Sequence, residues 1–267
     1  MKTAVYGGAF NPVHNEHIAI MRNLLHCGYD RVIALISGNP PHKVCEINSS
    51  HRLAMLKMAI KGLDGVIIDD IELRSDDIHY AADVLPIIKS KYGDFTYVLG
   101  GDSIIDLHKW SRPQSIMDMC PITVYARGER EHELRSAIDY WRSHGASIKL
   151  ADYRPKNISS TLIRYLAMLG IYEDVASEVQ EYIKLHSLYD NYKDFKEILK
   201  LHLKPARYEH CLRTCECALR LNHYCKLNLD YDKVFLSALL HDCGKGSSRF
   251  DIIKASKPLK ENADEED

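Results

Sequence analysis

The fold of this chain is decided by one stretch, residues 2–17, which read KTAVYGGAFNPVHNEH. Residues 2–6 are rich in β-forming side chains and run into the turn pair Gly7-Gly8, so they predict a strand that ends at the glycines. Apolar residues at helical spacing then begin after His17. A strand, a glycine turn and a helix in this order indicate the first unit of an α/β domain.

The same alternation of strand and helix continues to about residue 150. The further strands that we expect are Arg31–Ile36, Val66–Ile68, Phe95–Leu99, Pro121–Tyr125 and Ser147–Leu150. The helices that we expect between them are His17–Leu25, Arg52–Ile60, Ala81–Lys89 and Glu131–His144. This pattern predicts an α/β fold with a Rossmann-like, doubly wound parallel sheet, helices on both of its faces and ligands at the carboxyl ends of its strands.

The remainder of the chain predicts helices only. They are Ser159–Leu169, Val175–Leu185, Tyr192–Leu201, Tyr208–Leu221 and Tyr231–Leu240. We expect the α/β domain to span residues 1–188 and a short all-α region to span 189–246. Residues 247–267 are weakly patterned and end in a run of acidic side chains, which predicts a disordered tail.

The composition limits the classes of partner. The 267 residues include 35 Lys and Arg and 37 Asp and Glu, which gives a net charge of -2. Proteins that bind nucleic acids usually carry a basic excess, so a nucleic-acid partner is not expected. Any phosphate chemistry must therefore be local. We see no signal peptide and no apolar run of the roughly 20 residues that span a bilayer, so we expect a cytoplasmic protein without a membrane partner.

Four segments suited to phosphate binding lie where predicted strands end or a predicted helix begins. In the first, His14 and His17 lie three residues apart after Gly7-Gly8, so both imidazole rings can point at one site near a helix N-terminus. Two imidazoles in this position suit the stabilisation of a phosphate in a transition state. The other segments are Gly38 to Lys43, Gly100 to Ser103 and Ile158 to Arg164.

Taken in order, these segments resemble the bacterial nicotinate-nucleotide adenylyltransferases of the HxGH nucleotidyltransferase superfamily. The resemblance covers residues 1 to about 188. The motifs that carry it are Gly7-Gly8-x-Phe10, His14 with His17, Pro40-Pro41-His42-Lys43, Tyr80 with Asp83, Gly101-Asp102-x7-Trp110, Ile158 through Arg164, and Tyr182-Ile183-x-x-His186-x-Leu188-Tyr189.

The resemblance implies an enzyme of NAD biosynthesis that transfers the adenylyl group of ATP, accompanied by Mg²⁺, to nicotinate mononucleotide, giving deamido-NAD and pyrophosphate. It implies catalytic roles for His14, His17, Lys43 and Arg164. It implies ATP contacts from Gly7, Gly8, Phe10, Gly100, Gly101, Asp102, Ser159, Ser160 and Thr161. It implies mononucleotide contacts from Tyr80, Ala81 and Trp110, with the tryptophan stacked on the nicotinate ring.

The chain departs from the family pattern at two positions. Glu16 stands between the two histidines where the family usually has glycine, and Ala81 stands where it has threonine. A carboxylate at residue 16 repels a triphosphate unless it points outward or pairs with a cation.

A second constellation lies in the helical region. His210 is followed, about thirty residues later, by the adjacent pair His241-Asp242, and imidazole nitrogens with a carboxylate oxygen are metal ligands. The pattern resembles the HD-domain phosphohydrolases, particularly a bacterial branch proposed to cleave diadenosine tetraphosphate. No histidine follows Asp242, so we expect an incomplete site for a divalent transition metal, in an N-terminal fragment of such a domain that is either weakened or a relic.

Several alternatives stay open at this point. The α/β domain could serve another substrate of the same superfamily, such as phosphopantetheine. The chain could act first as a metal-dependent hydrolase of dinucleoside polyphosphates, with the α/β domain as a nucleotide sensor. A third reading is a nucleotide-binding module without catalysis. The sequence does not decide the oligomeric state.

Overall fold

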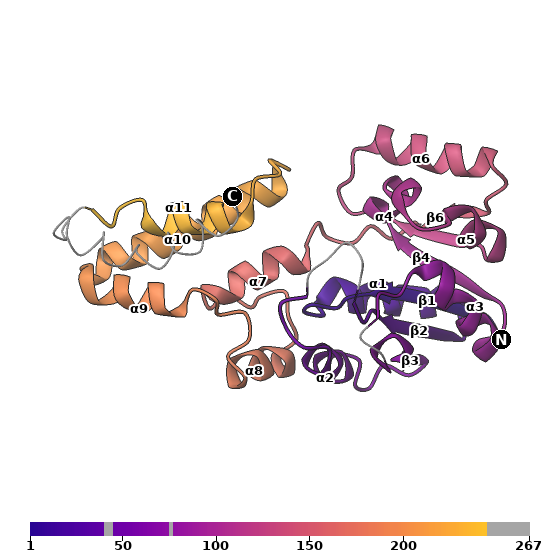
Figure 1. Cartoon of the computed structure of the whole chain (residues 1–267), viewed down its shortest axis with the longest axis horizontal. Coiled ribbons are helices and arrows are strands. Elements are labelled where there is room, and N and C mark those ends of the chain that lie inside the picture. The colour runs from indigo at the N-terminus through magenta and orange to yellow at the C-terminus, as the bar shows by residue number, and fades with distance from the viewer. Residues whose placement is uncertain (40–44, 75–76, 245–267) are drawn as a thin grey trace. The chain divides into compact units, whose positions relative to one another are not determined.

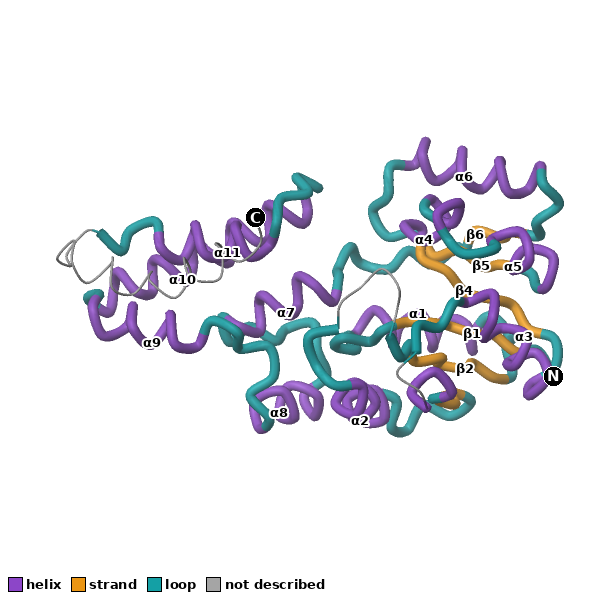
Figure 2. The backbone as a smooth tube through the Cα atoms, in the orientation of Figure 1, coloured by secondary structure: helices purple, strands orange, loops and turns teal. Residues whose placement is uncertain are grey.

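The computed structural model describes residues 1–39, 45–74 and 77–244. The chain forms two compact units, the first from Met1–Ser160 with Glu173–His186 and the second from Thr161–Tyr172 with Ser187–Asp267. Figures 1 and 2 show that the strands belong to the first unit and that the described part of the second unit is helical. The domain limits predicted from the sequence, with the tail over 247–267, stay predictions, and that tail lies outside the described residues.

The first unit is built on one six-stranded sheet with the order β3-β2-β1-β4-β5-β6, in which every pair of neighbours is parallel. This is the strand order of doubly wound nucleotide-binding folds, so the predicted fold class is confirmed. The strands are β1 (Thr3–Gly8), β2 (Arg31–Ile36), β3 (Val66–Asp69), β4 (Phe95–Gly100), β5 (Ile122–Tyr125) and β6 (Ile148–Leu150).

Helices connect and follow these strands (Figure 1). The first unit holds α1 (Asn15–His26), α2 (Ser49–Ala59), η1 (Ile71–Arg74), α3 (Ala81–Tyr92), α4 (Gly101–Ile105), η2 (Leu107–Lys109), α5 (Pro113–Met119), α6 (Glu131–Ser143) and α8 (Ser177–Leu185). The second unit holds α9 (Lys193–His202), α10 (Pro205–Tyr224), α11 (Tyr231–Leu240) and all of α7 (Ser160–Met168) after its first residue. Four short elements, η1, α4, η2 and α5, were not expected, because helices of so few residues leave little periodicity in a sequence.

Helices cover both faces of the sheet, as predicted. Val5, Ile33 and Tyr97 point to the face that packs against buried side chains of α3, α5 and α6. Side chains alternate along a strand, so Ala4 and Tyr125 point to the opposite face. There the Tyr125 hydroxyl donates a hydrogen bond to Asn23 of α1 at 2.8 Å, which places α1 on that face.

The loops after β1 and β2 are joined by Arg52 of α2. Its side chain is 1% exposed, and its guanidinium donates to the carbonyl oxygens of Ala9, Ser37 and Gly38 at 2.8, 2.7 and 2.7 Å. Gly38 must be glycine, because a Cβ there would lie 2.1 Å from the backbone oxygen of Glu72. These contacts fix the edge of the sheet at which the ligand is expected.

The second unit has an apolar core of its own. Its centre is made by Leu166 of α7, Cys211 and Leu219 of α10, and Phe235 and Leu239 of α11. Among the described residues, no helix combines the length and the apolar character that a bilayer crossing needs.

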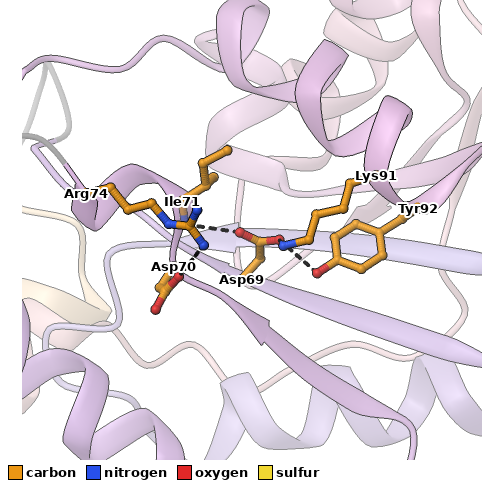
Figure 3. A network of polar contacts seen from close by, with 6 residues as sticks. All are labelled: Asp69, Asp70, Ile71, Arg74, Lys91 and Tyr92. Atoms are coloured by element: carbon orange, nitrogen blue, oxygen red, sulfur yellow. Dashed lines mark hydrogen bonds and ion pairs between the residues drawn. The ribbon is translucent and has the colours of Figure 1, made fainter.

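A buried carboxylate ties β3 to α3 (Figure 3). The Asp69 side chain is fully buried and accepts hydrogen bonds from Lys91 Nζ at 2.7 Å, Tyr92 Oη at 2.8 Å and the Ile71 backbone N–H at 3.0 Å. Burial alone would raise the pKa of Asp69, but these hydrogen bonds hold it below the ordinary value of 3.8. The charged form is therefore the one that stabilises the fold.

Asp69→Asn should lower the free energy of unfolding at pH 7 by about 2 kcal/mol, because charge-assisted hydrogen bonds are lost in a buried place. The Asp69 contribution is present above pH 3.8 and is lost as the pH falls below it, so the two curves should converge in acid. Urea unfolding across pH measures both. Asp70→Asn is the control, since the Asp70–Arg74 pair is exposed and should change stability by less than about 0.5 kcal/mol. An equal loss in both variants would contradict the prediction.

Candidate active site

The candidate active site lies at the carboxyl ends of β1 and β4. These strands are neighbours at the centre of the sheet, where the strand order reverses, and such a point forms the ligand crevice of a doubly wound fold. A cavity of about 460 Å³ opens there. Its lining includes six residues that the sequence predicted for ligand binding: Gly7, Gly8, Tyr80, Ala81, Asp102 and Trp110.

The two predicted histidines lie against each other at the start of α1. Their rings stack with centroids 3.6 Å apart and an interplanar angle of 27°. The His14 backbone N–H donates to Nδ1 of His17 at 3.2 Å. Because Nδ1 is the acceptor, the neutral His17 ring carries its proton on Nε2. The helix start therefore presents one imidazole N–H of defined position.

His14 is buried, with 2% of its surface exposed. Burial, assisted by the positive charge of Arg127, lowers the pKa of His14 to about 3, so this ring is uncharged at neutral pH. Within the described part of the chain, neither ring nitrogen of His14 has a hydrogen-bond partner. A buried imidazole without partners is costly, and a phosphate oxygen could accept a hydrogen bond from the one N–H of this neutral ring.

Phe10 packs against the ring of His17. It is 1% exposed, adopts a left-handed backbone conformation with φ 47°, and meets the His17 ring edge-on with centroids 5.1 Å apart. A Cβ on Gly8 would lie 3.2 Å from the Phe10 ring, so a larger residue there would require the ring to shift by a few tenths of an ångström. Phe10 was predicted to contact ATP, and its burial favours a packing role beneath the site.

A network of charged groups covers the end of β4. Asp102 Oδ2 lies 3.0 Å from the guanidinium of Arg127, which also donates to the Ile158 carbonyl at 3.3 Å. Glu129 accepts hydrogen bonds from the backbone N–H groups of Asp102 and Arg127 at 3.1 and 2.6 Å. Neither Arg127 nor Glu129 is among the site residues predicted from the sequence. Their signal was available, because both follow directly after β5, the neighbour of β4 in the sheet.

The hydroxyl and cationic residues that were predicted to bind phosphate do not all belong to the same unit of the chain. Ser159 and Ser160 lie in the first unit, where Ser160 Oγ donates to the Pro12 carbonyl at 3.0 Å, next to the histidine loop. Thr161 and Arg164 belong to the second unit, and Lys43 lies outside the described residues. The roles predicted for all five residues stay predictions.

The other end of the cavity carries the predicted mononucleotide residues. Trp110 is half-buried and packs against the core, Tyr80 is 39% exposed at the start of α3, and Ala81 follows it. The same cavity holds Glu72, which the sequence analysis did not single out. Burial raises the pKa of Glu72 to about 7, against the opposing effects of the Gly38 N–H, 3.3 Å away, and of Arg52. This carboxyl group is therefore partly protonated at neutral pH.

Glu16, the departure between the histidines, is buried and accepts its hydrogen bonds from Tyr153 and the backbone of Lys156. The family's threonine position, Ala81, keeps a backbone in the cavity lining but has no hydroxyl to offer.

The second unit brings His210, His241 and Asp242 together, with one ligand atom of each lying within 4.8 Å of the others. The two Nε2 atoms are 3.1 Å apart, and Nδ1 of His241 is bonded to the Ala238 carbonyl at 2.7 Å. That bond requires the His241 proton on Nδ1 and leaves the Nε2 lone pair for a metal. Two nitrogen donors and one carboxylate oxygen fit a divalent transition metal.

Two family models match this chain. The cytidylyltransferase-like model matches residues 5–166, and the HD domain model matches residues 207–265. The predicted nucleotidyltransferase fold family and the predicted HD domain are thereby confirmed. The HD match extends beyond residue 244, into the part of the chain outside the described residues.

Curated relatives carry the same assignment. A probable nicotinate-nucleotide adenylyltransferase of Serratia proteamaculans is 33% identical over 207 residues, covering 70% of this chain and 94% of its own. One from Clostridium acetobutylicum is 32% identical over 197 residues, covering 70% and 98%.

Solved structures support the fold. Plasmodium falciparum nicotinic acid mononucleotide adenylyltransferase complexed with NaAD matches with a TM-score of 0.58 at 19% identity, over 71% of this chain and 98% of that one. The model match and the curated relatives together show that this chain belongs to the cytidylyltransferase-like family and, within it, to the nicotinate-nucleotide adenylyltransferases, with an HD domain after the transferase part.

Proposed function

We propose that the first unit transfers the adenylyl group of ATP to nicotinate mononucleotide and releases pyrophosphate. The observation that carries this proposal is the stacked pair His14 and His17 at the start of α1, directly after the loop whose residues Gly7, Gly8 and Ala9 line a cavity that reaches Trp110. The names of the relatives support the same substrates. The product is the dinucleotide deamido-NAD.

The reaction needs no covalent enzyme intermediate. A phosphate oxygen of the mononucleotide attacks the α-phosphorus of ATP in line, and the bond from that phosphorus to the bridging oxygen of pyrophosphate breaks. Negative charge gathers on the oxygens of the transferred group, where the N–H of His17 and the single N–H of the neutral His14 ring can donate hydrogen bonds. Catalysis in this site is therefore positioning combined with charge stabilisation.

The surrounding residues hold the reactants. The glycines at the ends of β1 and β4 permit close backbone approach, and Asp102, held by Arg127, shapes the adenosine side. We propose that the phosphates of ATP are contacted by Ser159, Ser160, Thr161, Arg164 and Lys43. Mg²⁺ bound to ATP would neutralise part of the phosphate charge.

His17→Ala should lower kcat by about 100-fold or more, because the N–H that stabilises the transferred phosphate is removed. Pyrophosphate release from ATP and nicotinate mononucleotide measures the rate. His26→Ala is the matched control, since His26 is exposed in the last turn of the same helix and should leave kcat unchanged. Near-normal turnover of His17→Ala would contradict the proposed mechanism.

Trp110→Ala should raise KM for nicotinate mononucleotide roughly tenfold, because stacking of an aromatic ring contributes about 1–3 kcal/mol. KM for ATP should change little, and Trp110→Phe should restore most of the affinity. Tyr140→Ala, which removes an exposed ring on α6, controls for general effects.

The wild-type assay also separates the remaining alternatives for this unit. We expect faster pyrophosphate release with nicotinate mononucleotide than with its amide. Release only with phosphopantetheine would assign another substrate of the superfamily, and binding of ATP without any release would indicate a module without catalysis.

For the second unit, we propose that His210, His241 and Asp242 bind one divalent transition metal. The supporting observation is the convergence of three ligand atoms, with the tautomer of His241 set by the Ala238 carbonyl. A metal held there would supply a Lewis acid for the hydrolysis of dinucleoside polyphosphates, the alternative activity of this chain.

His241→Ala should abolish the binding of one Mn²⁺ ion per chain, because it removes the best-oriented nitrogen ligand. Mn²⁺ is the suitable probe, since it prefers nitrogen and oxygen ligands and avoids the cysteines of this unit. Electron paramagnetic resonance counts the bound ion, with His202→Ala on α9 as control. Equal Mn²⁺ binding by wild type and His241→Ala would contradict the site.

A further inference from the structure

The residue that the proposed mechanism leaves unused is Glu16. It is the second residue of α1, lies between His14 and His17 in the sequence, and is only 7% exposed. Burial of a carboxylate is costly unless hydrogen bonds compensate for the lost water. The contacts that compensate this one therefore indicate what the residue does.

One oxygen of Glu16 receives two hydrogen bonds. Tyr153 Oη donates to Oε2 at 3.1 Å, and the backbone N–H of Lys156 donates to the same oxygen at 3.0 Å. Burial, with the Glu16 hydrogen bond adding to it, raises the pKa of Tyr153, so its hydroxyl stays a donor at neutral pH. The carboxylate is thus committed to the segment that follows β6.

That segment is held at two further points of the first unit. The Ile158 carbonyl accepts from Arg127, and Ser160 Oγ donates to the Pro12 carbonyl. Residues 153–160 therefore run between the start of α1 and the charged network at the end of β4. The hydrogen bonds to Glu16 connect this segment to α1, the helix that also carries His17.

We propose that Glu16 is a positioning residue, which anchors residues 153–160 to the first turn of α1 and so fixes His17 relative to Ser159 and Ser160. This inference rests on the proposed function of the first unit. What the anchor requires is an oxygen acceptor at Oε2, not a negative charge. The competing reading is that Glu16 only repels the triphosphate of ATP.

Three variants separate the two readings. Glu16→Gln keeps an amide oxygen that can accept both hydrogen bonds, so its kcat should stay within about twofold of wild type. Glu16→Gly removes the acceptor, and its kcat should fall about tenfold, because misplaced catalytic groups lose rate steeply. Tyr153→Phe, which removes one of the two donors, should lower kcat about threefold. KM for nicotinate mononucleotide should stay unchanged in all three.

The control is Glu178→Gly. Glu178 is the second residue of α8 in the same unit but is exposed, so this variant carries the same backbone cost of glycine without loss of the anchor and should keep its kcat. Thermal unfolding of each variant reports whether it folds, and Tyr153→Phe decides the question where Glu16→Gly does not fold.

Repulsion predicts the opposite pattern, in which both Glu16→Gln and Glu16→Gly turn over faster and bind ATP more tightly. That result, or unchanged kcat in Glu16→Gly and Tyr153→Phe, would overturn the proposal. Absence of pyrophosphate release by the wild type would instead count against the proposed function of the unit.

Discussion

The architecture of the active site depends on the buried guanidinium of Arg52. A parallel sheet brings the ends of its strands to one edge, but it leaves the carbonyl groups of the loops beyond those ends without partners. Arg52 satisfies three of them, one after β1 and two after β2. A lysine presents a single ammonium group in place of this planar fork and would not match the geometry. The loop that leads to Phe10 and His14 is therefore held by a side chain of α2, which is distant in the sequence.

Burial then determines the charge states of the site. His14 is neutral because it is buried near Arg127, and Glu72 is partly protonated because it is buried in the cavity wall. The guanidinium of Arg127 stays charged beside these groups, where Asp102 pairs with it at 3.0 Å. The first unit thus sets the charge of each group locally, although the chain as a whole has a net charge of -2.

Much of this could be predicted from the sequence, because the signals were local. The structure confirms the strand periodicity, and it places the predicted glycines at the ends of β1 and β4, the two histidines side by side, and Trp110 in the cavity lining. The contacts of Arg52, Arg127 and Glu16 could not be predicted, because their partners lie 14 or more residues away and depend on how the loops pack. The short helix α4 was missed because five residues carry no clear period.

The cluster of His210, His241 and Asp242 in the second unit also depends on packing between residues that are distant in the sequence. His210 directly precedes Cys211, and His241 follows Leu239 by two residues; both of these apolar neighbours are fully buried in the contact of α10 with α11. The two rings therefore meet because the helices share a core, since the sequence separates them by 31 residues. The shared core thus positions the helix segments that carry the two rings. Retention of the apolar positions preserves the cluster whether or not it is catalytic, so metal binding and hydrolysis have to be assessed as separate properties.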